Sequence, residues 1–133
     1  VRAQAEMFTE LSDILFLDSI DSVAGLIDVF YSNSAVQYIF EEPEEICAKI
    51  CRLDPKYIIL ERNFLIEGEK SFLVTQDFKG QKIAEWIFGR EHLEELFEKR
   101  NYQLVEVRKH RREAEDSWGW NKWYWDVVFE KAI

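Results

Sequence analysis

The stretch between Leu26 and Arg62 constrains the fold of this chain more than any other part of its sequence. It contains a strand, a polar loop, a helix, a second strand and a second polar loop, at residues 26–31, 32–34, 43–53, 56–60 and 61–63. This order predicts a βαβ unit with two parallel strands. Because open α/β sheets bind ligands beyond the carboxyl ends of their strands, we expect a site at the two polar loops.

No glycine-rich turn accompanies this unit. The five glycines are scattered, at positions 25, 68, 80, 89 and 119, and none of them forms a G-x-G-x-x-G or P-loop spacing. A nucleotide-type fold normally begins with such a turn. The chain is therefore predicted to correspond to the second half of a fold of this kind.

Size and charge limit the possible partners. A chain of 133 residues is expected to form one domain, and its net charge of −9 disfavours nucleic acid or an anionic membrane surface as a partner. No apolar run approaches the length that spans a bilayer. Cys47 and Cys51 are predicted to be half-buried free thiols of a cytoplasmic protein. The start at Val1, without a methionine, suggests a fragment.

Further elements follow from periodicity. Helices are expected at 2–11 and 91–100, and strands at 13–18, 71–76, 102–107 and 123–130. The last two strands should form an antiparallel pair, and 71–76 should belong to a hairpin after a turn at 67–69. The inward stripe of the helix at 43–53 is expected to be Ile46, Cys47, Ile50 and Leu53. Val29 and Ile59 are predicted core residues, whereas Asn33 and Gln37 are predicted to be exposed.

Five segments resemble one family. They are Asp28-Val-Phe-Tyr-Ser-Asn-Ser-Ala-Val-Gln-Tyr-Ile39, Pro55-Lys-Tyr-Ile-Ile-Leu-Glu-Arg-Asn63, Phe72-Leu-Val-Thr-Gln76, Trp86-Ile-Phe88 and Val127-Val-Phe-Glu130. Together they resemble the carboxyl-terminal portion of class I S-adenosylmethionine-dependent methyltransferases, in particular a family with a Leu-Gln-Tyr motif after its fourth strand. The resemblance implies an α/β fold, a truncated Rossmann-like sheet with an antiparallel closing pair.

The sequence also departs from that family. In this alignment Ile14 to Asp18 would be the third strand, so residues 1–133 form one domain without the first two strands and the glycine-rich cofactor loop. Asn33 and Ser34 stand where the family has Ser and Gly, while Glu61 replaces Asp and Asn63 replaces Thr. The cofactor S-adenosylmethionine is thus implied for the complete fold, and we expect no useful affinity from this chain alone.

The resemblance also assigns site residues. The cofactor side would be formed by Asp18, Ser19, Asn33 and Ser34. The substrate side would be formed by Gln37, Tyr38, Arg62 and Trp86. Each assignment has a structural alternative: Asp18 as a turn or cap acid, Gln37 and Tyr38 as a packed first turn, and Arg62 as an ion-pair partner of Glu61, Glu67 or Glu69. No catalytic base and no metal site are identified, and His92 and His110 are expected at the surface.

The implied function is methyl transfer to an unidentified small-molecule substrate. The alternative is a non-catalytic binding or assembly module derived from the same fold. The tryptophans at 118–125 either form an aromatic wall for a flat or sugar-like ligand or are buried in the sheet and an interface. A homodimer is also predicted, through these tryptophans or through the strand edge at 26–31, because an uncovered apolar strand edge promotes association.

Overall fold

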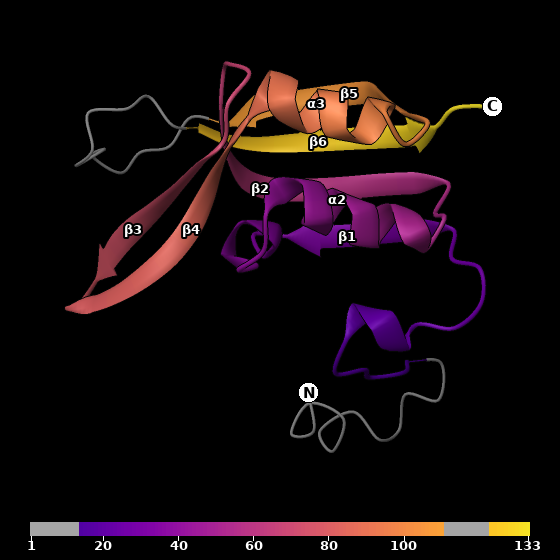
Figure 1. Ribbon diagram of the computed structural model, residues 1–133, viewed down its shortest axis with the longest axis horizontal. Coiled ribbons are helices and arrows are strands. Elements are labelled where there is room, and N and C mark those ends of the chain that lie inside the picture. The colour runs from indigo at the N-terminus through magenta and orange to yellow at the C-terminus, as the bar shows by residue number, and fades with distance from the viewer. Residues whose placement is uncertain (1–13, 111–122) are drawn as a thin grey trace.

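The computed structural model describes residues 14–110 and 123–133 and contains a six-stranded mixed sheet. Its elements are η1 (Ile20–Ser22), β1 (Val29–Asn33), η2 (Val36–Tyr38), α2 (Pro43–Arg52), β2 (Tyr57–Ile66), β3 (Phe72–Phe78), β4 (Gln81–Gly89), α3 (Arg90–Glu98), β5 (Tyr102–His110) and β6 (Trp123–Lys131). The main path of the sheet is β3-β4-β2-β6-β5, and β1 pairs with β2 (Figure 1). The predicted α/β class with a mixed sheet is confirmed.

Strand β2 organises the sheet because it has three neighbours. On one edge it pairs antiparallel with β6 from Tyr57 to Leu65. On the other edge it pairs in parallel first with β1, from Tyr57 to Glu61, and then with β4, at Leu65 and Ile66. A strand has only two edges, so β1 and β4 share the second one in succession. The residues between these two pairings therefore lie where the sheet changes partner.

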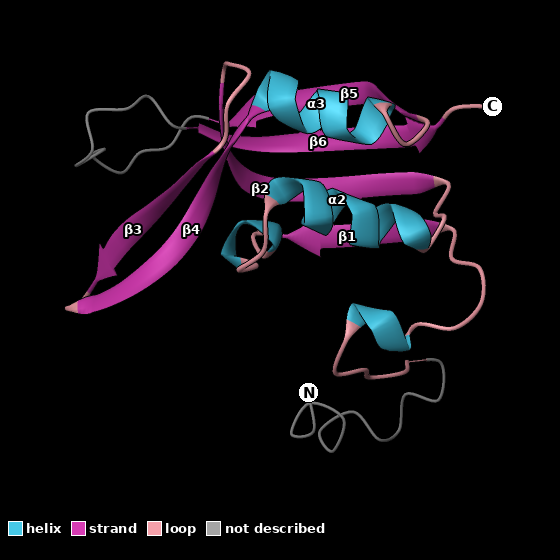
Figure 2. Cartoon of the chain, viewed as in Figure 1, coloured by secondary structure: helices cyan, strands magenta, loops and turns pink. Residues whose placement is uncertain are grey.

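The core lies between this sheet and the two α-helices. Its members from α2 and α3 are Ile46, Cys47, Ile50, Leu93, Leu96 and Phe97, and they pack on Ile58, Leu60, Val127 and Phe129 of the sheet. Full burial of one such side chain contributes about 1.5–3 kcal/mol, so this layer accounts for much of the stability. Both helices lie on the same side of the strands (Figure 2). Helix α2 begins with Pro43 in its first turn and ends before Asp54, whose φ is 54°.

Strands β3 and β4 form an arm that extends away from the body of the sheet (Figure 1). Seven consecutive pairs join the two strands, from Phe72 with Ile87 to Phe78 with Gln81. Lys79 and Gly80 form the connecting turn and have φ values of 53° and 81°, as a two-residue hairpin turn requires. The Asp77 carboxylate accepts the Gly80 N–H at 2.9 Å and holds the turn.

Three predictions about strands are wrong. Residues 14–18 contain no strand, because Ile14 and Leu15 are exposed and have no strand to pair with. The first parallel strand begins at Val29 rather than Leu26, and Val29 is 45% exposed because it points away from the helices. The polar residues 61–63 form no loop but a bulge inside β2, because β6 continues the hydrogen-bonded ladder past them.

The other element predictions within the described residues are confirmed. Helices 43–53 and 91–100 appear with boundaries shifted by one or two residues, and β5 with β6 forms the antiparallel closing pair. Trp125 is buried, which agrees with the burial alternative for the tryptophans at 118–125. The helix predicted at 2–11 and the tryptophans at 118 and 120 lie outside the described residues. In the part of the chain that is described, no helix is long and apolar enough to cross a membrane.

Candidate functional site

The carboxyl edge of the parallel pair begins where β1 ends. The last pair of residues is Asn33 with Glu61. Ser34 then adopts a left-handed conformation with φ of 53°, and its N–H donates to the Glu61 carbonyl at 2.8 Å. This bond closes the ladder and turns the chain into the loop that carries η2. The sequence thus places a polar loop at the sheet edge, as the βαβ pattern predicted.

A compact polar cluster, formed by Tyr31, Asn33 and Glu61, lies at this edge on the sheet face opposite the helices. The Tyr31 hydroxyl donates to Glu61 Oε2 at 2.7 Å. The Asn33 amide nitrogen lies 3.3 Å from the same oxygen and 3.2 Å from the Tyr31 hydroxyl. The carboxylate is therefore held by two side chains of the neighbouring strand, which fixes its position at the strand end.

Gln37 is fully buried, which corrects the expectation that it is exposed. Helix η2 lies against both β2 and β4, and β2 changes its partner from β1 to β4 in this region, so Gln37 is buried there. The Gln37 amide nitrogen donates to Ser34 Oγ at 3.3 Å, and no described group donates to its Oε1. The buried Gln37 side chain therefore connects η2 to Ser34 at the start of the loop. The side chain of its neighbour Tyr38 is exposed.

Arg62 lies in the bulge of β2, one residue beyond the last pair of β1 and β2. Its φ is 53°, and its backbone N–H donates to Asp126 Oδ1 on β6 at 3.0 Å. Its side chain is exposed, and no ion pair joins it to Glu61, Glu67 or Glu69. The next residue, Asn63, is buried and donates its amide N–H to the Glu61 carbonyl at 3.1 Å. The bulge thus keeps Arg62 at the carboxyl edge although the strand continues.

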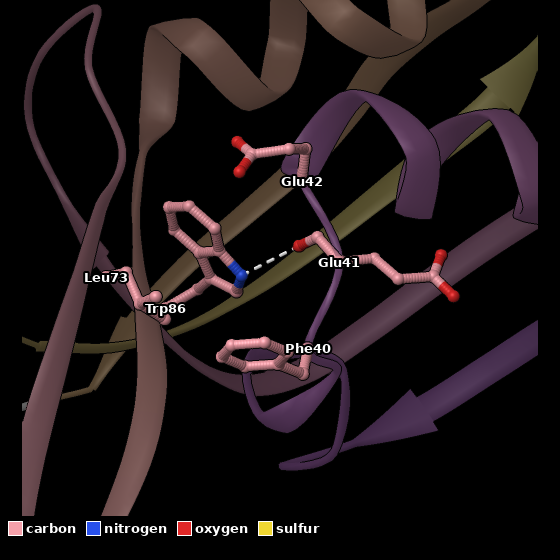
Figure 3. A pocket seen from close by; sticks show the side chains of 5 residues that line it. All are labelled: Phe40, Glu41, Glu42, Leu73 and Trp86. Carbon is pink, nitrogen blue, oxygen red and sulfur yellow. Dashed lines mark hydrogen bonds between the residues drawn. The ribbon is translucent and has the colours of Figure 1, made fainter.

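An aromatic notch opens at the end of the η2 loop. It is lined by Phe40, Glu41, Glu42, Leu73 and Trp86 and has a volume of about 60 Å³ (Figure 3). The indole N–H of Trp86 donates to the Glu41 carbonyl at 2.9 Å, which fastens the loop to β4. Phe40 is 79% exposed. The space is large enough for the edge of one ring or a small substituent, with the rest of a ligand lying outside.

The acidic side chains at the notch differ in their roles. The Glu41 carboxylate points away from Trp86 and pairs with Lys49 of α2 (Figure 3). The Glu42 carboxylate lies on the Trp86 side of the loop (Figure 3). A ligand whose apolar edge enters the notch would therefore meet one carboxylate at the rim, which favours a cationic or hydrogen-bond-donating group at that point.

Asp18 and Ser19 lie at the other end of the sheet. Ser19 caps η1 and accepts the Asp21 N–H at 3.1 Å, and Asp21 pairs with Arg52 at 2.7 Å. Arg52 ends α2, whereas the beginning of α2 lies beside the notch. A helix of ten residues is roughly 15 Å long, so the structure does not bring Asp18 and Ser19 together with Asn33 and Ser34.

Sequence reasoning missed six residues of this region: Tyr31, Phe40, Glu41, Glu42, Glu61 and Leu73. A signal existed for Glu61, which directly follows the apolar run 56–60 at a predicted strand end. It also missed the contact between His92 and Ser71, whose Nδ1 and Oγ atoms are 2.8 Å apart. Ser71 Oγ also accepts the Gly89 N–H at 3.1 Å, so this pair fastens the beginning of α3. Among the described residues, no group of His, Cys, Asp or Glu is placed to hold a metal ion.

Comparisons with known proteins identify the fold. No protein-family model and no curated protein matches the sequence. A Listeria monocytogenes protein, provisionally described as an S-adenosylmethionine-dependent methyltransferase, aligns with a TM-score of 0.69 at 14% identity, over 99% of this chain and 76% of its own. A Methanosarcina mazei S-adenosylmethionine-dependent methyltransferase aligns with a TM-score of 0.57 at 14% identity, over 87% of this chain and 66% of its own.

A third structure contains ligands. Burkholderia thailandensis 1,6-didemethyltoxoflavin-N1-methyltransferase, with bound 1,6-didemethyltoxoflavin and S-adenosylhomocysteine, aligns with a TM-score of 0.64 at 13% identity. The alignment covers 98% of this chain and 56% of that enzyme, so the chain spans just over half of its length. At such low identity these likenesses show that the fold is shared and nothing finer.

Proposed function

We propose that this chain contributes the methyl-acceptor side of an S-adenosylmethionine-dependent methyltransferase. The observation that supports the proposal most is the path of one loop. Between Ser34 and Glu42 it runs from the carboxyl edge of β1 to the aromatic notch at Trp86. In a fold shared with methyltransferases, this loop would connect the reacting centre to a substrate subsite. We propose that the methyl acceptor is a small molecule.

Methyl transfer requires an in-line approach of acceptor and donor, so positioning is the main task of the protein. Trp86 would hold the apolar edge of the acceptor, and Glu42 would bind a donor group beside it. Tyr38 and Arg62 are exposed at the same edge and would contact the remainder of the acceptor. Gln37 is buried and would act as a positioning residue, because it holds the loop through Ser34.

The described residues do not fit S-adenosylmethionine by themselves. The Asn33 amide is committed to Tyr31 and Glu61, and the Ser34 hydroxyl accepts from Gln37. Asp18 and Ser19 lie at the opposite end of the sheet. Asn33 and Ser34 would therefore form only the edge of a cofactor site. We propose that further residues are needed to complete that site.

NMR titration tests both sides of the proposal. The ¹⁵N-labelled chain is titrated with S-adenosylhomocysteine and, separately, with indole and quinoline as ring probes. We expect weak, millimolar shifts of the amides at 33–38 with the first ligand. We expect shifts of the Trp86 indole N–H with the ring probes. A Trp86→Phe variant assigns the indole signal, and Phe40→Ala should weaken ring binding by about fivefold or more, because it removes one wall.

Tyr57→Phe is the matched control, because Tyr57 is an exposed aromatic residue remote from the notch, bonded to Glu130 at 3.1 Å. Its ring affinity should equal that of the wild type. If ring probes shift Trp86 but S-adenosylhomocysteine leaves 33–38 unchanged, the notch is a binding site and the methyltransferase proposal fails. If neither ligand produces shifts, both parts of the proposal fail.

The second candidate function is a non-catalytic binding or assembly module of the same fold. It is favoured by the internal hydrogen bonds that occupy the Asn33 amide nitrogen and one acceptor position of Ser34 Oγ. We further propose that the protein is cytoplasmic, because Cys47 and Cys51 are both free thiols. We also propose that the chain forms a homodimer, because exposed apolar strands promote association.

A further inference from the structure

The β3–β4 arm presents two chemically different faces. The cross-strand pairs place Phe72, Val74, Gln76 and Phe78 of β3 on one face with Gln81 and Ile83 of β4. Glu85 of β4 lies on this face opposite Val74 and is fully buried. Farther toward the tip the face carries no charged residue, and Phe78 and Ile83 are 53% and 37% exposed. The opposite face carries the pair of Leu73 and Trp86 near the base, then Thr75 with Ala84, and the charged pair of Asp77 and Lys82 toward the tip. The apolar face is therefore the one that would gain from being covered.

A two-stranded ribbon cannot form a core of its own, so it is marginally stable without a packing partner. The overall charge of −9 makes two copies of the chain repel each other over most of their surface. The arm from Phe72 to Gly89 differs, because Lys79 and Lys82 balance Asp77 and Glu85 and the arm carries no net charge. Its outer part, from Phe72 to Ala84, carries a net charge of +1. Contact between two copies is thus least opposed by charge at the arm.

An acidic hollow lies at the base of the arm. It has a volume of about 460 Å³ and is open to solvent. Ile66 and Phe72 supply apolar lining, and Glu67, Glu69 and Glu91 supply three carboxylates against the single ammonium of Lys70. Arg90 pairs with Glu67 at 3.0 Å and with Glu91 at 3.3 Å, and Glu69 has no ion pair among the described residues. The hollow therefore suits an apolar group that carries a positive charge.

The tip of the arm has that composition. Phe78 is exposed, and the Lys79 ammonium lies 5.5 Å from the centre of its ring. We propose that two copies of this chain exchange arms, with the tip of each arm seated in the acidic hollow at the base of the other. Phe78 then meets Ile66 and Phe72 of the second copy, and Lys79 meets Glu69.

The geometry of the arm is compatible with a closed two-fold contact. Phe72 and Phe78 lie on the same face and are six residues apart, which is roughly 20 Å along a strand. A two-fold axis near the middle of the arm, beside Val74 and Ile83, places each tip against the other base. Both copies use the same surface in this contact, so the dimer leaves no unpaired surface to which a third copy could bind. Within one chain, the extended ribbon keeps its tip away from its own hollow.

Sedimentation velocity tests the proposal with the chain as it stands. At about 100 µM the wild type should sediment as a dimer. Ile83→Lys places a charge on the apolar face and should raise the dimer dissociation constant by about tenfold or more, because it buries an unpaired charge. Thr75→Lys introduces the same charge on the opposite face of the same arm. This control should change the constant by less than about twofold.

Charge-reversal variants test whether the tip of the arm binds in the acidic hollow. Lys79→Glu and Glu69→Lys should each weaken the dimer by roughly fivefold, and the double variant should restore it, because the attraction returns with its signs reversed. A monomeric wild type would overturn the proposal, as would failure of the double variant to restore the dimer. A dimer that survives Ile83→Lys but is lost in Tyr31→Lys would assign the contact to the edge of β1 and also refute the arm exchange.

Discussion

Gly89 is predicted to be a position where one added methyl group is strongly destabilising. It joins β4 to α3, and its φ of −69° and ψ of 128° suit any residue, so the backbone itself would not be strained by alanine. The constraint is space. A Cβ at this position would lie 2.5 Å from the Gly68 carbonyl oxygen and within overlap distance of the Lys70 carbonyl oxygen. Both are backbone atoms, so neither can rotate away.

The cost follows from the movement that alanine requires. Relief of the overlap needs a displacement of roughly 1 Å, and overpacking of this kind typically costs about 1–3 kcal/mol. The 66–71 segment is also held to α3 by two hydrogen bonds, from the Glu91 N–H to the Gly68 carbonyl at 3.2 Å and from the Gly89 N–H to Ser71 Oγ at 3.1 Å. Loss of both adds roughly 1–3 kcal/mol. Gly89→Ala should therefore lower the free energy of unfolding by about 2–6 kcal/mol.

Urea unfolding followed by tryptophan fluorescence measures this change. The two free energies of unfolding can be compared if the wild type and the variant show the same dependence on urea concentration. Gly80→Ala is the control. Gly80 has a φ of 81° but no atom within 4 Å of its Cβ position, so its cost should be limited to the left-handed backbone, about 1–2 kcal/mol. If Gly89→Ala proved no more destabilising than Gly80→Ala, the argument from close backbone approach would be refuted.

Three further outcomes are expected. Ile58→Ala should cost about 2–5 kcal/mol in urea unfolding because it empties a core site, whereas Val29→Ala, at an exposed position, should cost less than about 1 kcal/mol. Calorimetric titration of the isolated chain with S-adenosylmethionine should show no micromolar binding, because residues 1–133 contain no glycine-rich loop to bring backbone N–H groups to such a cofactor. Burial raises the pKa of Cys51 to about 11 and raises that of Cys47 further. Unfolded thiols ionise near pH 8.5, so the free energy of unfolding should fall as the pH rises above that value, and Cys47→Ala should reduce this slope.

Much of the fold was predictable because its signals are local. The inward stripe of α2 follows from helical periodicity: Ile46, Cys47 and Ile50 are buried, whereas Leu53 lies just beyond the end of the helix and is half-buried. The alternation that buries Trp125 is likewise a property of a short segment. The turn at Lys79 and Gly80 was not predicted. Segment 14–18 shows the limit, because an apolar run becomes a strand only if a neighbouring strand offers an edge. None of the described strands does so.

The candidate site was predictable in part. The polar loop after β1 lies at the carboxyl edge, as the βαβ pattern indicated, and Trp86 lines a notch beside it. Gln37 was expected at the surface, because polarity alone favours exposure. Its burial depends on the contact of η2 with β2 and β4, which involves residues 50 positions away. Asp18 and Ser19 were assigned to the cofactor side because the alignment treated residues 14–18 as a strand. The structure has no strand there.

The sequence by itself determined the βαβ unit, the two amphipathic helices and the antiparallel closing pair, because hydrophobic periodicity and turn residues act within a few positions. Only the tertiary structure decided which side chains meet at the carboxyl edge. Arg62 lies in a strand rather than a loop because β6 extends the ladder past it, and Glu61 is held by Tyr31 because β1 pairs in one particular register. Strand register and edge sharing join distant residues, so they arise from the packing of the whole sheet.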